Sequence, residues 1–178
     1  MLKRVTFSGD NQLISQIALH HRDLEDALRQ YFSLESGTIP GRYVGYTRSE
    51  LAAELQRRLA EIELTSSMAV LAAFEASLRV DYLKRCYEKR KDPLSRDFRE
   101  VYAQRGSRAG LEDEILAAWC RALPRSKPLI DNLIAAFKFR HWLAHGRYWT
   151  PKWGAKPIDF QEVYMLVDWA GRQFDLKV

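Results

Sequence analysis

The chain has 178 residues and a formal net charge of +5, with 47% hydrophobic and 29% charged residues. These values exclude a wholly disordered protein, and the length fits one domain over residues 1–178. The positive charge permits an anionic partner such as RNA without requiring one. The first ten residues contain no apolar signal-peptide core, and the densest apolar run, residues 68–74, is too short to span a bilayer. We therefore expect a cytoplasmic protein with no membrane partner.

The first third of the chain contains a helical pattern followed by a loop. The helix is expected to begin at Ser8 or Asp10, either of which can cap it, and to end near Phe32. Its apolar stripe includes His21, and a lone histidine on such a face is more often a buried core residue than a ligand. The glycines and the proline of residues 34–46 predict a loop.

Thr47 and Glu50 form a capping box that starts the next helix, because the hydroxyl takes a backbone N–H and the carboxylate reaches back. The helical pattern of residues 64–90 either continues this helix or forms a separate one. Glu75 interrupts the apolar stripe of that pattern. It either pairs at the surface with Arg79, which is the simpler interpretation, or forms a buried acid that faces the motif described below.

Residues 84–108 are rich in lysine and arginine, with acidic residues interleaved. A mixed charge run usually marks a solvated surface, although the same side chains could contact an RNA backbone. Pro93 interrupts the run and ends the helical pattern before it. Ser95 is expected to cap a short helix that follows.

The late part of the chain is expected to hold three more helices. Residues 111–123 form one, and residues 126–145 form the next, with Ser126 as its cap and a proline in its first turn. Because residues 126–145 are apolar around much of the helix, we expect this helix to lie buried at the centre of the bundle. After a loop, Asp159 and Glu162 cap the last helix. The sequence therefore predicts an all-α bundle of five or six helices.

The end of the 126–145 helix carries residues that suit phosphodiester chemistry. Arg140 and His145 stand five positions apart, with His141 beside the arginine. Arginine is a permanent cation whose planar fork can hold a phosphate, and histidine can take or give a proton near neutral pH. A structural interpretation also exists, because cations at a helix C-terminus are stabilised by the helix dipole and by free carbonyl groups.

An ideal helix places Arg140 and His145 about 140° apart around its axis, so they share a ligand only if the helix ends between them or distorts. Gly146 provides such an ending. His141 and His145 are four residues apart, which is the spacing of a zinc pair, so a metal-dependent hydrolase is a second alternative. No third ligand stands near them, and neither Cys86 nor Cys120 has metal-ligand spacing. We expect no metal and no cofactor.

Residues 140–145 (RHWLAH) resemble the signature of HEPN (higher eukaryotes and prokaryotes nucleotide-binding) domains, in which an arginine, a polar residue, a short spacer and a histidine end a buried helix. The resemblance implies a HEPN-like bundle and a metal-independent endoribonuclease. Such an enzyme would cleave single-stranded RNA through attack of the ribose 2′-hydroxyl. Arg140, His145 and His141 would be catalytic. If Glu75 is the buried acid considered above, it would be a supporting acid beside them.

The resemblance also implies partners. Two HEPN motifs usually meet across a dimer interface, so a homodimer with a composite cleft is expected. Many stand-alone members act as toxins or in phage defence beside a nucleotidyltransferase-type antitoxin, and some are modified on a tyrosine two residues after the motif histidine. Here that position is Arg147, and Tyr148 follows it. A non-catalytic HEPN module that binds nucleotide, RNA or a partner protein is the first alternative.

The loop after the motif mixes aromatic and basic residues. Aromatic rings can stack on unpaired bases while cations contact phosphates. The residues predicted to bind RNA in this way are Arg147, Tyr148, Trp149, Lys152 and Trp153. Packing of the aromatic rings over the end of the bundle is the alternative.

Overall fold

The computed structural model describes residues 4–33, 41–151 and 159–177, and all regular secondary structure in these ranges is helical. The predicted all-α class, with five or six helices, is therefore confirmed. None of the described helices has the length and apolar character needed to cross a membrane. The elements in chain order are α1 (Ile14–Tyr31), the 3₁₀ turn η2 (Gly41–Tyr43), α2 (Arg48–Tyr87), α3 (Pro93–Arg105), the 3₁₀ turn η3 (Gly106–Arg108), the π-helix η4 (Leu111–Leu116), α4 (Ala117–Ala122), the 3₁₀ turn η5 (Pro124–Ser126), α5 (Lys127–Ala144) and α6 (Phe160–Gln173).

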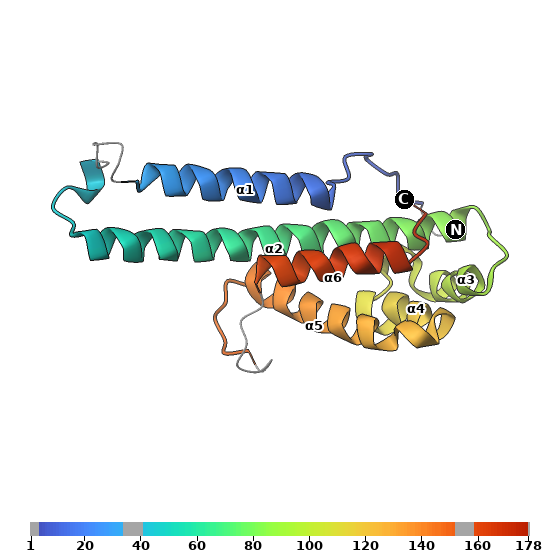
Figure 1. Cartoon of the computed structure of the whole chain (residues 1–178). Coiled ribbons are helices and arrows are strands. Elements are labelled where there is room, and N and C mark those ends of the chain that lie inside the picture. The colour runs from blue at the N-terminus through green and yellow to red at the C-terminus, as the bar shows by residue number, and fades with distance from the viewer. Residues whose placement is uncertain (1–3, 34–40, 152–158, 178) are drawn as a thin grey trace.

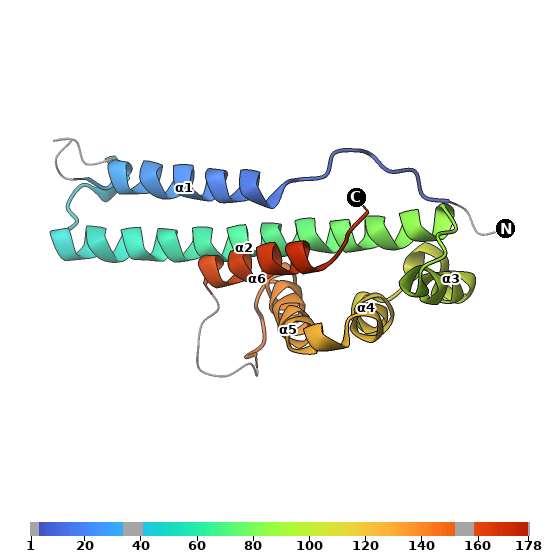
Figure 2. The ribbon, with the colours of Figure 1, turned by 45° about the vertical axis from the view of Figure 1, so that its right-hand side comes forward.

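α1, α3, η4, α5 and α6 pack against the 40-residue helix α2, and α4 packs on η4 and α3 (Figure 1). α1 lies along one side of α2, whereas α3, α4 and α5 lie on the other side and α6 runs beside it (Figures 1 and 2). Residues 48–87 contain no glycine or proline, so nothing interrupts the helical hydrogen bonds. The two helical patterns seen in this part of the sequence are thus one continuous helix.

The expectation that the 126–145 helix lies at the centre of the bundle is wrong. α5 packs against α2 and α6 on one side only, while Asp131, Asn132, Ala135 and Lys138 on its other side are exposed. Its apolar residues cover a wide stripe rather than the whole circumference, and α2 and α6 together bury that stripe. Ser126 precedes α5 but makes no capping hydrogen bond through its side chain.

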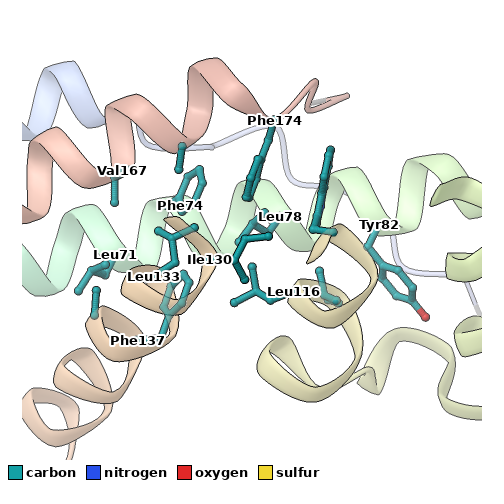
Figure 3. Close-up of a cluster of buried hydrophobic side chains, with 14 of the residues drawn as sticks. Leu71, Phe74, Leu78, Tyr82, Leu116, Ile130, Leu133, Phe137, Val167 and Phe174 are labelled. Carbon is teal, nitrogen blue, oxygen red and sulfur yellow. The ribbon is translucent and has the colours of Figure 1, made fainter. Parts of the chain in front are cut away.

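The core forms where α2, α5 and α6 meet (Figure 3). The residues of α2 that enter it stand three or four positions apart, as expected for one helical face. Each large apolar side chain buried in this way contributes about 1.5–3 kcal/mol. The labelled members are Leu71, Phe74, Leu78 and Tyr82 from α2, Leu116 from η4, Ile130, Leu133 and Phe137 from α5, Val167 from α6, and Phe174 just after it.

The ends of the first helices are partly as predicted. The capping box that starts α2 is confirmed: the Glu50 N–H donates to Thr47 Oγ1 (3.3 Å) and the Thr47 N–H donates to Glu50 Oε2 (2.7 Å). The predicted start of α1 is wrong, because the helix begins after Leu13, which makes no side-chain cap. Ser8 Oγ instead accepts a hydrogen bond from the Asp10 N–H (3.2 Å), which closes a local turn before the helix.

The cap of α3 also differs from the expectation. Asp92, and not Ser95, is the capping residue, and its carboxylate accepts a hydrogen bond from the Ser95 N–H (3.0 Å). Pro93 occupies the first turn, where the missing N–H costs little. At α6 Asp159 is the capping residue as expected, since its carboxylate accepts from the Glu162 N–H (2.7 Å).

A buried ion pair on α2 holds the end of the chain in place. Arg85 Nε lies 2.8 Å from Asp81 Oδ1, and their side chains are 5% and 0% exposed. Arg85 also donates to the Asp175 carbonyl (2.6 Å), and the Lys177 N–H donates to Asp81 (2.8 Å). Burial raises the pKa of the Asp81 carboxyl, and these two donors offset part of that effect.

Removing Asp81 should therefore destabilise the fold strongly. We expect Asp81→Ala to lower the free energy of unfolding by roughly 3–5 kcal/mol, because it leaves the buried Arg85 guanidinium without its buried carboxylate partner. Urea unfolding followed by circular dichroism measures this loss. The control is Asp131→Ala, which breaks an exposed pair with Lys127 and should cost no more than about 1 kcal/mol. Similar losses for the two variants would contradict a special role of the buried pair.

Candidate functional site

The chain turns sharply where α5 ends. His145 is the residue that follows the last helical position, and Gly146 and Arg147 both adopt positive φ angles, +77° and +59°. The Arg147 N–H donates to the Trp142 carbonyl (3.1 Å), which closes the end of the helix. Gly146 adopts this conformation without strain, as expected for a residue that ends a helix. A positive φ is uncommon for arginine, so the fold must hold Arg147 in place.

Glu61 of α2 holds Arg147. The two guanidinium nitrogens of Arg147 donate to the two carboxylate oxygens of Glu61, at 2.9 and 3.1 Å. A bidentate pair of this kind fixes the orientation of both groups as well as their distance. Arg147 is thus engaged by a residue 86 positions earlier in the chain.

Glu75 lies between two arginines. Its Oε1 accepts a hydrogen bond from Arg79 Nε (2.8 Å), and its Oε2 lies 3.4 Å from Arg140 Nη1. Both interpretations of Glu75 are thus present in one network, the helical pair with Arg79 and the contact with the motif arginine. Arg79 is anchored in turn to the Ala109 carbonyl (3.1 Å). The shorter contact makes Arg79 the stronger partner of the carboxylate.

Arg140 is partly buried, with 34% of its side chain exposed. Its Nε is buried and has no hydrogen-bond partner among the described residues. Because a buried donor without a partner is costly, this atom marks a place where a ligand atom or a water molecule would be stabilising.

The two motif histidines lie beside one another at the surface. The ring centroids of His141 and His145 are 4.2 Å apart, and the His141 ring lies 6.0 Å from the Trp149 ring. Trp142 Nε1 donates to the Trp149 carbonyl (2.8 Å), which folds the loop back against α5. His145 therefore contacts the motif through the ring of His141.

A cavity of about 790 Å³ opens between α2, η4, α5 and the loop after α5. Arg140, His141 and Glu75 line it, whereas His145 is not among the described lining residues. Lys138 adds a second cation to the wall, and Glu112 and Asp113 of η4 add carboxylates. The place of η4 in this wall could not be predicted from the sequence, because residues 111–116 lie far from the motif in the chain.

Only some of the residues predicted to bind RNA lie at the cavity. Trp149 lines the cavity, and Tyr148 is 82% exposed with its ring against Trp149 (4.7 Å between centroids). Arg147 is held by Glu61, so contact with a phosphate requires that ion pair to open or to be shared. Lys152 and Trp153 lie outside the described residues.

The zinc alternative lacks a third ligand. In residues 4–33, 41–151 and 159–177, no carboxylate, cysteine or further histidine joins His141 and His145 to form a group of three ligands. Two ligands from the protein are fewer than either structural or catalytic zinc sites contain.

The contact between Glu75 and Arg140 can be measured with a double-mutant cycle. We expect Glu75→Gln and Arg140→Gln to couple by about 0.5–1 kcal/mol in the free energy of unfolding, since the two side chains are in direct contact and partly buried. The control cycle pairs Glu75→Gln with Lys138→Gln, because Lys138 lines the same cavity but forms no ion pair with Glu75 among the described residues. Coupling in the control cycle as large as in the first would mean that the cavity, and not the ion pair, connects the residues.

Comparisons with models of protein families, with curated proteins and with solved structures give no match to this chain. Its function is therefore argued from the geometry of the α5 end and from the motif that this end carries.

Proposed function

We propose that the protein is a HEPN-type endoribonuclease that cleaves single-stranded RNA without a metal ion. The observation that carries the proposal is the meeting of Arg140 and His141 in one cavity wall, with His145 in ring contact with His141. A phosphate-binding cation and two imidazoles that can transfer protons suit this reaction.

The reaction is a transesterification. The ribose 2′-oxygen forms a bond to phosphorus as the bond between phosphorus and the 5′-oxygen breaks, which gives a 2′,3′-cyclic phosphate and a 5′-hydroxyl. His145 takes or gives a proton in this step, and His141 orients groups or relays protons beside it. Arg140 donates hydrogen bonds to the phosphate oxygens and stabilises the charge that develops on them.

The network around Arg140 is compatible with this role. Glu75 contacts Arg140 at 3.4 Å through one terminal nitrogen, while Arg79 binds the same carboxylate more closely at 2.8 Å. When a phosphate approaches, Glu75 keeps its stronger partner and Arg140 keeps unused donors, including its buried Nε. Glu75 therefore acts as a positioning group that holds the guanidinium against the cavity until substrate arrives.

The proposal extends to partners. In a homodimer, two α5 ends meet across a two-fold axis and form a composite cleft, in which Tyr148 and Trp149 stack on bases. A cognate nucleotidyltransferase-type antitoxin and a role as a toxin or in phage defence belong to the same proposal, by analogy with stand-alone HEPN proteins.

The mechanism predicts cleavage of RNA in the presence of EDTA. We expect His145→Ala and Arg140→Ala each to lower the rate by roughly a hundredfold or more, through lost proton transfer and lost charge stabilisation. Arg140→Lys should recover little activity, because an ammonium group lacks the fork. DNA of the same sequence should resist, since it has no 2′-hydroxyl. Gel analysis of end-labelled substrates measures rate and product ends.

His20→Ala is the matched control, because His20 is exposed on α1 and outside the motif. This variant should cleave like the unaltered protein, and circular dichroism should show that all variants are folded. Full cleavage by His145→Ala would exclude the proposed mechanism. Binding of RNA without any cleavage by the unaltered protein would leave the non-catalytic HEPN module in its place.

The composite cleft predicts a symmetric dimer. Light scattering at tens of micromolar, a concentration above ordinary dimer dissociation constants, should give twice the mass of the chain. Cross-linking between cysteines introduced at Tyr148 should occur across the two-fold axis, whereas a cysteine at Gln30 on α1 should not cross-link. A monomer at this concentration would count against the composite site.

A further inference from the structure

A second group of chemically active side chains lies apart from the motif, between α1, α2 and the start of α6. His21 and Glu25 of α1 face Glu63 of α2 beside the first residue of α6. These three residues line a separate cavity of about 500 Å³ that shares no described residue with the first. His21 is buried, as its place on an apolar stripe predicts, and stacks on Phe160 with ring centroids 3.9 Å apart.

Each of the three side chains is held by a partner on its outer side. His21 Nδ1 lies 3.0 Å from Ser66 Oγ, and Glu25 Oε1 accepts from Arg29 Nη2 (3.4 Å). Glu63 Oε2 accepts from the Phe160 N–H (2.7 Å). Metal ligands in proteins are oriented by such outer contacts, and a histidine whose Nδ1–H is donated presents the lone pair of Nε2 to the ion.

The remaining atoms point toward one another without forming hydrogen bonds. His21 Nε2 lies 3.6 Å from Glu25 Oε2 and 3.8 Å from Glu63 Oε1, and all three atoms lie within 4.8 Å of one another. The His21 side chain is only 5% exposed, and its Nε2 faces the two carboxylates. Ligands at about 2.0–2.1 Å from a tetrahedral ion are separated by about 3.4 Å, so a small closing movement completes the geometry.

Charge favours the same occupant. Two carboxylates converge on His21, and one of them, Glu25, also pairs with Arg29 through its other oxygen. A divalent cation balances the two negative charges. One nitrogen and two carboxylate oxygens suit zinc and its first-row neighbours better than magnesium or calcium, which prefer oxygen alone.

We propose that His21, Glu25 and Glu63 bind a divalent transition-metal ion of the zinc class. The ion ties α1 to α2 and, through the Glu63 contact to Phe160, to the start of α6. Because the cavity opens to solvent on the remaining side, water completes the coordination. This site goes beyond the proposed ribonuclease, whose reaction uses no metal ion.

Metal titration of the 178-residue chain tests the site. After removal of metal with EDTA and dialysis, isothermal titration with Zn²⁺ should show one ion per chain, and Zn²⁺ should raise the melting temperature. Glu25→Gln and Glu63→Gln should each weaken binding by roughly tenfold or more, because each removes a charged ligand while keeping the shape of the side chain. Co²⁺ should give a tetrahedral visible spectrum without a thiolate charge-transfer band, which separates this site from the cysteines.

Glu61→Gln is the matched control, since Glu61 lies two residues from Glu63 on the same helix but pairs with Arg147. It should bind Zn²⁺ like the unaltered protein. The His141→Ala and His145→Ala variants should do the same. The proposal is overturned if Zn²⁺, Co²⁺ and Mn²⁺ all fail to bind at 100 µM, a concentration roughly a hundredfold above the dissociation constant expected of a functional site. Binding that survives Glu63→Gln and disappears with the two histidine variants also overturns it. RNA cleavage in EDTA is measured with this site empty, so the two proposals fail independently.

Discussion

The acidic residues of α2 hold the remainder of the structure together. Along one helix, Glu54 accepts from the tyrosine of η2, Glu61 binds the arginine after α5, and Glu63 accepts the first N–H of α6. Glu75 contacts the motif arginine, and Asp81 binds the C-terminal segment. Four of these five are only partly exposed or buried, where hydrogen bonds to charged groups are stronger than at the surface. The turn before α2, both ends of the loop between α5 and α6, and the C-terminal segment therefore have anchors on the same helix, and the apolar face of α2 is left for the core.

Features that depend on a few neighbouring residues could be predicted from the sequence. The cap at Thr47 and Glu50 and the burial of His21 are of this kind, because a cap joins residues three apart and an apolar stripe repeats every three or four. The centre of the bundle could not be predicted in this way. The apolar character of residues 126–145 pointed to α5 as the central helix. α2 has more neighbours because it is longer. Its length could not be read from the sequence, because its residues formed two separate helical patterns there.

The candidate site was visible in the sequence only through its motif. Glu75 could be recognised as unusual because it interrupts an apolar stripe. Arg79, four residues later, was one of the two partners expected for it, and the two side chains do pair. Its contact with Arg140, the place of η4 in the cavity wall and the pair between Glu61 and Arg147 join residues far apart in the chain. No periodicity reports such contacts. The same limit applies to His21, since its apolar stripe predicts burial but does not show which acids of another helix face the ring.

The two sites are connected by one turn of α2. Two residues correspond to about 200° of rotation around the helix axis, so Glu61 and Glu63 lie on nearly opposite sides of α2. Glu61 holds Arg147 at the beginning of the loop between α5 and α6, and Glu63 holds Phe160 at its end. Both ends of this loop, which carries Tyr148 and Trp149 beside the cavity, are thus fixed to the same turn. An ion bound by His21, Glu25 and Glu63 would hold the Glu63 carboxylate and with it the far end of the loop. Occupancy of the second site would therefore act on the part of the chain that is proposed to contact RNA, although the sites share no residue.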